Sequence, residues 1–226
     1  MGTMTFAEMR DELMFALDNR GETTASGVTP ARKSRWINSA YRHVSMPSVF
    51  RHRELEVSQD VTLVTSTASY SLNSDLWAIQ SVYNTTSLRE RRLRPRSMRQ
   101  LDSMLTTLGE PTLYARWGNT IHLRRVPSSS FNGDTLRVRY WDRPSLLSAD
   151  SDLSVLTDEW DEIIIMGARW RGWLWMNVPD RAEQARQDFG RMINEITDTF
   201  QLEGEDTDWN PEVYVDDPMA HASRHS

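Results

Sequence analysis

The sequence of 226 residues contains no cysteine, only one lysine and no long uninterrupted apolar run. The lack of cysteine excludes disulfide bonds, thiolate metal sites and cysteine nucleophiles. The most apolar stretch, residues 163–178, contains two arginines and is shorter than the ~20 apolar residues of a membrane-spanning helix. The N-terminal residues 1–17 carry three acids within their apolar pattern, which is not typical of a signal peptide. We therefore expect a soluble, non-secreted protein that does not enter a membrane.

Motifs of the common enzyme classes are also missing from the sequence. There is no glycine-rich phosphate loop, no GxSxG nucleophile elbow and no HExxH zinc motif, and the five histidines are not spaced as zinc ligands. The acids Asp158, Glu159, Asp161 and Glu162 cluster where a helix is expected to begin, and the helix dipole accounts for them better than acid–base catalysis does. We therefore predict that the protein is not an enzyme and uses neither a cofactor nor a metal ion.

Helical periodicity marks both ends of the chain. Near the N-terminus, apolar residues repeat at helical spacing over residues 5–19 and again over 30–46. Towards the C-terminus, helices are expected at about 158–176, which is apolar on nearly all sides, and at about 180–200. We expect these four helices to pair with one another.

The segment between these helices has the pattern of β-strands. From residue 53 to 140, β-branched and aromatic residues alternate with polar ones in several short runs. The clearest signal is a hairpin over 112–126 with Gly118 and Asn119 in its turn. A strand over 135–141 places apolar residues on one face and arginines on the other, as in a half-exposed antiparallel sheet.

Together these patterns predict an α+β fold that is mainly helical. It consists of a four-helix bundle built from the N- and C-terminal helix pairs, an inserted small antiparallel β lobe and an extended C-terminal tail. The expected parts are the N-terminal helix pair of the bundle at 1–50, the β-rich lobe with a short helix at 51–143, the loop and C-terminal helix pair at 144–202, and the acidic extended tail at 203–226.

Charge is unevenly distributed along the chain. The net charge is −6, and residues 201–226, which hold seven acids and one base, account for all of it. This segment has no periodicity and too few apolar residues to offset its ordering entropy alone. Two aromatic residues, Trp209 and Tyr214, lie among its acids.

The strongest basic signal is the run from Arg89 to Arg99, which holds six arginines and is opposed only by Glu90. Such a run can contact phosphates. It has no interleaved aromatics, and the chain before residue 201, which includes this run, is neutral overall. Both observations favour an interface with an acidic protein partner. A tryptophan cluster in the helix at 158–176 is more typical of a core or a subunit contact than of a ligand cleft. The candidate interface residues are Arg89, Arg91, Arg92, Arg94, Arg96, Trp170 and Trp173.

Several segments occur in an order that resembles a known family. The segments are WINSAYR at 36–42, DLWAIQSVY at 75–83, LRP at 93–95, PTLYA at 111–115, WGN at 117–119, IHL at 121–123, LRVRYW at 136–141 and LTDEW at 156–160. In this order they resemble the head-to-tail adaptor (connector) proteins of tailed bacteriophages, and the resemblance covers about residues 5–200.

The resemblance implies a structural subunit of the virion, located at the head–tail junction and assembled in the host cytoplasm. It implies a homo-oligomeric ring, commonly of twelve copies, docked beneath the portal protein. Such a ring extends the channel through which genomic DNA passes without sequence-specific binding, and it offers its far side to a downstream tail or nozzle/stopper protein. The C-terminal segment is then expected to reach the portal, and the residues expected to dock there are Trp209, Pro211, Val213 and Tyr214.

Two other functions stay open at this stage. A nucleic-acid-binding module centred on Arg89–Arg99 predicts a salt-sensitive affinity of the isolated chain for DNA. A hydrolase would need two carboxylates in a cleft with separated pKa values, and the sequence contains no motif for it.

Overall fold

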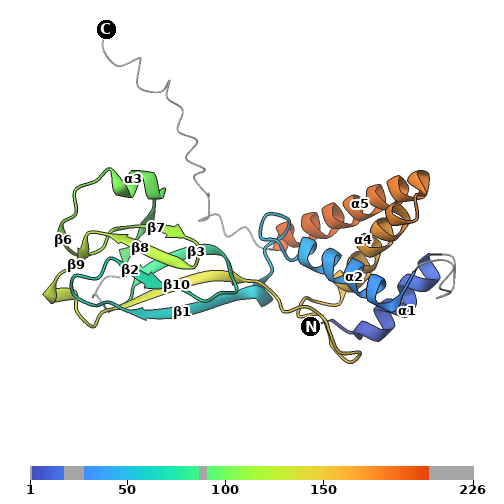
Figure 1. Ribbon diagram of the computed structural model, residues 1–226, viewed down its shortest axis with the longest axis horizontal. Helices are drawn as coiled ribbons and strands as arrows, with labels where there is room; N and C mark the ends of the chain where they lie inside the picture. The colour runs from blue at the N-terminus through green and yellow to red at the C-terminus, as the bar shows by residue number, and fades with distance from the viewer. Residues whose placement is uncertain (1, 18–27, 87–90, 204–226) are drawn as a thin grey trace, which may run out of the picture.

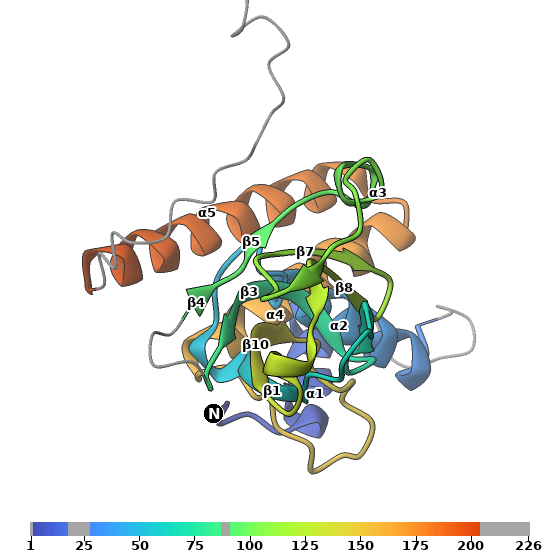
Figure 2. The same ribbon diagram turned by 90° about the vertical axis from the view of Figure 1, so that its left-hand side faces the viewer.

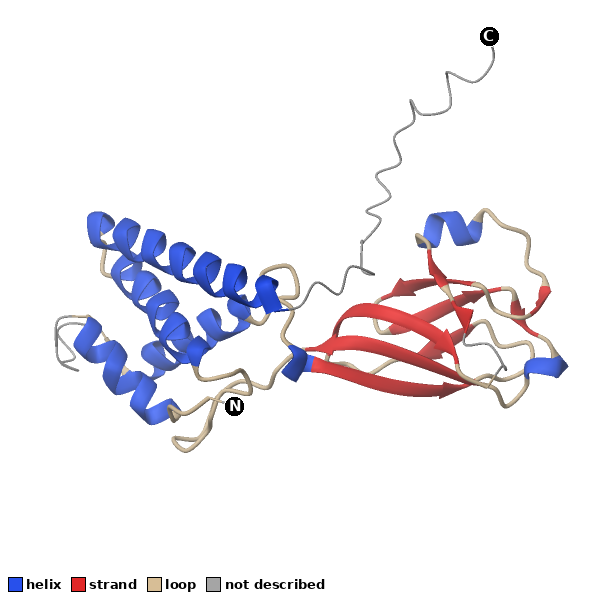
Figure 3. Ribbon diagram, turned by 180° about the vertical axis from the view of Figure 1, so that it is seen from behind, coloured by secondary structure: helices blue, strands red, loops and turns tan. Residues whose placement is uncertain are grey.

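The computed structural model describes residues 2–17, 28–86 and 91–203, with side chains described up to residue 199. The molecule is elongated, with long helices at one end and sheets at the other (Figures 1 and 3). The helices are α1 (Phe6–Ala16), α2 (Pro30–Val44), α3 (Met98–Asp102), α4 (Glu159–Trp175) and α5 (Pro179–Glu203). None of the helices in these ranges combines the length and the apolar character that crossing a bilayer requires.

Local signals in the sequence set where the N-terminal helices begin. Thr5 and Glu8 form a capping box at the start of α1, in which the Glu8 carboxylate accepts a hydrogen bond from the Thr5 amide over 2.8 Å. At α2, the Thr29 hydroxyl accepts a hydrogen bond from the Arg32 amide over 3.3 Å, and Pro30 occupies the first turn. The expected starts of both helices are confirmed.

Helix α4 lies at the centre of the helical part, where it packs against α1, α2 and α5 (Figure 1). This explains why its sequence is apolar nearly all round, because each side faces a neighbouring element. Gly167 and Gly172 of α4 let the neighbouring helices approach closely. The fully buried side chains of this core include Phe6, Met9, Leu13, Ile37, Tyr41, Trp160, Ile164 and Trp173.

The strands form two four-stranded sheets and one two-stranded sheet within the described residues. The first sheet has the order β1 (Glu56–Thr62), β10 (Thr135–Asp142), β3 (Leu76–Asn84), β4 (Arg91–Arg92). The second has the order β2 (Ser69–Ser71), β8 (Thr120–Arg124), β7 (Leu113–Trp117), β5 (Arg94–Pro95). The third pairs β6 (Leu108–Gly109) with β9 (Val126–Pro127), and short 3-10 helices occupy Arg53–Leu55 and Ser129–Phe131.

A second core lies between the two larger sheets, because both contribute side chains to one buried cluster. Along β10, Leu136, Val138 and Tyr140 are buried, whereas Arg139 is exposed, as the alternation in the sequence predicted. The predicted hairpin is also confirmed: β7 and β8 pair antiparallel, and Gly118 has a φ of 59° in the turn.

The prediction of a mainly helical four-helix bundle with a small β lobe is wrong. The fold is α+β with 41% helix and 26% strand in the described part of the chain, and its sheets enclose a core of their own. The prediction underestimated the strands because their pairing is not local. Strand β1 pairs with β10, and β10 with β3, across more than fifty intervening residues in each case. The boundaries of the four expected parts stay a prediction.

The two ends of the molecule are joined by more than the two chain segments that pass between them. On β10, Tyr140 belongs to the core between the sheets, while the next residue, Trp141, points to the opposite face and belongs to the helical core. Leu55, just before β1, also packs in the helical core. The sheet end therefore serves as a wall of the helical core, which ties the two parts together.

The buried His52 predicts a pH dependence of stability. Its ring is 1% exposed and lies against Phe50 and Trp160, with centroid distances of 4.9 Å and 4.6 Å. Burial lowers the pKa of His52 below its ordinary value of 6.5, although the hydrogen bond with the Val44 carbonyl acts in the opposite direction. Above pH 6.5 both the folded and the unfolded imidazole are neutral; below it, the unfolded chain binds a proton that the folded chain binds less readily.

The free energy of unfolding should therefore fall as the pH is lowered below 6.5, by at most about 1.4 kcal/mol per pH unit for this group. Urea unfolding at pH 7.5, 6.5 and 5.5 measures this slope. His52→Gln, which keeps a donor for the Val44 carbonyl but does not titrate, should show a smaller slope. Some slope should persist, because burial also lowers the pKa of His43. Equal slopes in the two proteins would contradict the assignment.

Candidate assembly surfaces

The arginine run lies along an edge that the two large sheets share. Strand β4 is the outer strand of the first sheet and β5 that of the second, so residues 91–95 pass from one sheet to the other. Between them Leu93 is buried at 1% exposure, and its amide donates to the Val82 carbonyl over 2.8 Å. The Arg94 amide instead donates to the Thr112 carbonyl over 2.9 Å. This anchoring holds the neighbouring arginine side chains at the surface.

We refer to Arg91, Arg92, Arg94, Arg96 and Arg99 as the arginine edge. All are exposed except Arg96, which is half-buried. Arg91 forms an ion pair of 2.6 Å with Glu110, whereas Arg92, Arg94 and Arg99 form no ion pair with an acid of the described residues. Burial raises the pKa of Tyr114 to about 12, although the charge of Arg92 acts in the opposite direction. Arg89, predicted as part of the same interface, lies outside the described residues.

An exposed apolar loop follows the arginine edge in the chain. Met104, Leu105 and Leu108, which we call the apolar loop, are 38%, 89% and 64% exposed. The loop is nevertheless held in place, since the Val126 amide donates to the Thr107 carbonyl over 2.9 Å and β6 pairs with β9. Apolar side chains held in water are typical of a surface that contacts another protein. The exposure of these side chains was not predicted, because the sequence does not distinguish an apolar residue that packs inwards from one that faces water.

The tryptophan cluster of α4 divides between the interior and the surface. Trp173 is 1% exposed and lies in the helical core, with the Arg181 guanidinium 4.7 Å from its ring centre. Trp170 is half-buried, and its ring lies 6.2 Å from that of Phe189. Trp175 is 44% exposed and is covered in part by Arg32, 4.2 Å from its ring centre. Of the two predicted interface tryptophans, only Trp170 has surface to offer a partner.

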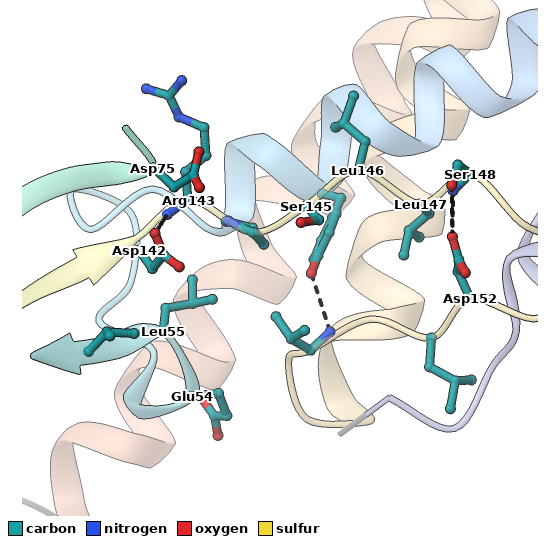
Figure 4. A pocket seen from close by; sticks show the side chains of 15 residues that line it. Glu54, Leu55, Asp75, Asp142, Arg143, Ser145, Leu146, Leu147, Ser148 and Asp152 are labelled. Carbon is teal, nitrogen blue, oxygen red and sulfur yellow. Dashed lines mark hydrogen bonds between the residues drawn. The ribbon is translucent and has the colours of Figure 1, made fainter. Parts of the chain in front are cut away.

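A groove of about 490 Å³ lies where the helical part meets the sheets (Figure 4). Tyr41 of α2 lines it, and the Tyr41 hydroxyl accepts a hydrogen bond from the Val155 amide over 3.2 Å. Asp152 lines it as well, and its carboxylate accepts hydrogen bonds from the amides of Ser148 and Ala149 over 2.6 Å and 2.8 Å. These bonds fix the loop between β10 and α4 that forms one wall of the groove.

The groove contains charged and apolar side chains together. Burial raises the pKa of Asp142 above its ordinary value and the charge of Asp75 adds to the shift, while a hydrogen bond of 3.0 Å from the Arg143 amide opposes it. Leu146 on the rim is 43% exposed. This mixed lining is typical of a protein contact surface. Within the described ranges, no three metal-ligating side chains come together.

The acidic C-terminal segment continues from α5, which ends at Glu203. Viewed along the long axis of the molecule, the end of α5 lies on the same side as β4, whereas α3 lies on the opposite side (Figure 2). The four residues predicted to dock onto the portal lie outside the described residues: Trp209, Pro211, Val213 and Tyr214.

A family model described as SU10 adaptor protein matches residues 4–215, which include the helical part, both large sheets and part of the acidic segment. A search of curated proteins finds no match. The match confirms the resemblance to phage head-to-tail adaptors that the sequence segments indicated.

Proposed function

Because the chain belongs to the SU10 adaptor protein family, we propose that it is a structural head-to-tail adaptor of a tailed bacteriophage. The extent of the match, residues 4–215, carries this proposal, since it includes the surfaces through which an adaptor would bind its partners. In this proposal, copies of the chain form a ring, commonly of twelve, beneath the portal protein. The ring extends the channel for genomic DNA and attaches a tail or nozzle/stopper protein on its far side.

The exposed surfaces support a role in binding proteins. Arg92 and Arg94 are exposed, and so are the side chains of the apolar loop further along the chain. Charge can set the orientation of a protein interface, and apolar contact contributes to its affinity. Trp170 adds a half-buried aromatic surface on the helical part. Trp173 is buried, so it would contribute to binding only indirectly, by holding α4 in place.

Binding to portal rings tests the proposal directly. The purified chain is mixed with portal rings encoded by the same genome, sedimented, and imaged by electron microscopy. A second ring stacked on the portal is the expected result. A well-folded chain that leaves the portal bare would overturn the adaptor role. If that chain also bound duplex DNA with an affinity that fell steeply with salt, the nucleic-acid-binding function would take its place.

The acidic segment is expected to carry much of the affinity for the portal. A chain that ends at Glu203 lacks Trp209, Val213 and Tyr214 and should no longer co-sediment with portal rings, because aromatic anchors dominate most interfaces. A chain that ends at Asp217 keeps these residues and serves as the matched control, which should bind as the full chain does. If the chain ending at Glu203 bound the portal undiminished, the docking role of the segment would be wrong, while the adaptor role would stand.

A further inference from the structure

Helix α1 carries two acids and an exposed aromatic residue on the side away from the helical core. Its buried residues repeat at helical spacing, and Asp11, Glu12 and Phe15 lie on the opposite side, where all three are exposed. We call these three residues the acidic stripe. Neither carboxylate forms an ion pair with a base of the described residues, and Phe15 is 64% exposed. An exposed ring beside unpaired charges on one helix face is typical of a surface that contacts another protein.

Helix α2 and the end of α4 present the opposite charge. Arg35 and Arg42 are exposed two turns apart on the side of α2 away from the core. Arg171 of α4 adds a third guanidinium, because it donates to the hydroxyl of Ser39, which lies between them on α2, over 3.0 Å. Trp175 is 44% exposed beside the first turns of α2. We call Arg35, Arg42, Arg171 and Trp175 the basic patch. Within the described ranges, none of its arginines forms an ion pair with an acid.

The acidic stripe and the basic patch have the same order along the molecule. Helix α1 runs from the sheets towards the free end of the helical part, and α2 runs back from that end (Figure 1). The end of α4 lies there too, since a Cβ atom on Gly172 would lie 3.0 Å from Leu17 and 3.4 Å from Trp36. On both surfaces the charges therefore lie nearer the sheets and the exposed ring lies at the free end. A rotation about the long axis keeps each residue at its level, so opposite charges and the two rings meet.

The two surfaces lie on different sides of the helical part. Viewed along the long axis, α1 lies below α4 and α2 lies to its right (Figure 2). One copy can therefore bind a neighbour through α1 and a second neighbour through α2. A contact between two different surfaces of the same chain is heterologous, and it closes into a ring where the rotation between neighbours allows it.

We propose that the acidic stripe of one copy docks onto the basic patch of a second copy. Asp11 and Glu12 contact Arg35 and Arg42, and the Phe15 ring packs against Trp175. The opposite charges set the orientation of the two copies, and the rings contribute apolar contact. That the resulting ring is the one beneath the portal rests on the proposed function. The contact between copies does not depend on it.

Cross-linking between two single-cysteine chains tests the contact. Because the sequence has no cysteine, Ala16→Cys, one turn after Glu12, and Ala31→Cys, one turn before Arg35, each provide one thiol and leave both surfaces intact. The two full-length chains, one of them tagged, are mixed at high concentration with a short bismaleimide, with and without portal rings. The product that joins the two different chains should predominate over both homodimers, because α1 of one copy lies beside α2 of the next.

Charge reversal identifies the residues that make the contact. Asp11→Arg combined with Glu12→Arg in the Ala16→Cys chain should lower the yield of the mixed product about tenfold or more, because like charges then face each other. Arg35→Glu combined with Arg42→Glu in the Ala31→Cys chain should restore the yield. Glu54→Arg combined with Asp102→Arg in the Ala16→Cys chain makes the same change in net charge at two exposed acids elsewhere and should leave the yield unchanged.

The outcomes separate this contact from the adaptor role. No mixed product with or without portal rings, or an equal yield after reversal of Asp11 and Glu12, would overturn the contact. A predominance of α1–α1 homodimers would overturn it in favour of a symmetric dimer. A second ring on the portal without the mixed product would leave the adaptor role standing and the contact wrong. The mixed product from a chain that leaves the portal bare would support the contact and count against the adaptor role.

Discussion

Replacing Trp160 by alanine is expected to lower the free energy of unfolding by about 3–5 kcal/mol, as for other large aromatic residues in a core. Trp160 is 1% exposed at the start of α4. Its ring lies 5.1 Å from Phe50 and 4.6 Å from His52, which belong to the segment that leads from the helices to β1. The cavity would therefore open where the helical part is joined to the sheets, and few side chains there are free to fill it.

Chemical unfolding of the wild type and the variant measures this loss, and the exposed Trp117 provides the matched control. Trp117 is 69% exposed at the turn of the β7–β8 hairpin, so Trp117→Ala should change stability by no more than about 0.5 kcal/mol. If both variants lost the same stability, Trp160 would not have the special position that its burial indicates.

Gly167→Leu is expected to destabilise the helical part by about 3 kcal/mol, the upper end of what overpacking usually costs. A Cβ atom at Gly167 would lie 2.8 Å from Cε2 of Phe189 on α5 and 3.0 Å from Cβ of Ala40 on α2. Both neighbours are buried, at 4% and 0% exposure, so neither can move aside without displacing its helix. The larger leucine side chain would force α2, α4 and α5 apart.

At Gly190 of α5, the same substitution is expected to have the opposite effect on stability. No atom lies within 4 Å of a Cβ built at Gly190. Gly190→Leu should therefore raise stability by about 0.5–1 kcal/mol, because leucine favours a helix more than glycine does. Thermal unfolding of both variants measures whether each substitution lowers or raises stability. A stabilising Gly167→Leu would show that the three helices do not pack as closely as described.

The long helices were largely predictable because their signals are local. Thr5 with Glu8, and Thr29 with Pro30, mark helix starts within a few residues, and the apolar stripes repeat within each helix. The hairpin around Gly118 was predictable for the same reason, since its two strands are neighbours in sequence.

The sheets were not predictable in this way, and the error in the fold class follows from that. Nothing in the local pattern of residues 56–62 indicates that their partners lie at 135–142. The short strands β4 and β5 are defined only by the strands beside them, so a run of arginines gave no signal that the chain passes between two sheets there.

The candidate surfaces were predicted in part. Charge spacing alone identified the arginine edge, because six arginines in eleven residues seldom lie in an interior. The burial of the tryptophans was harder to predict. Helical periodicity shows on which face of a helix a residue lies, but not which face a neighbouring element covers. Trp173 is buried, whereas Trp175, two positions later, is exposed. The exposure of Leu105 could not be predicted from the sequence, because an apolar residue in a loop can equally pack inwards.

The passage of residues 91–95 between the sheets has a consequence for colloidal behaviour. An outer strand normally presents unpaired amides and carbonyls to which a strand of another molecule can add, which is how many β-proteins begin to form fibrils. Here the outer strands are only two residues long, carry arginines that repel one another between molecules, and include Pro95, which has no amide hydrogen to offer. The same residues that make this side a docking surface therefore protect it against sheet extension, and the chain can accumulate to high concentration without aggregating along this edge.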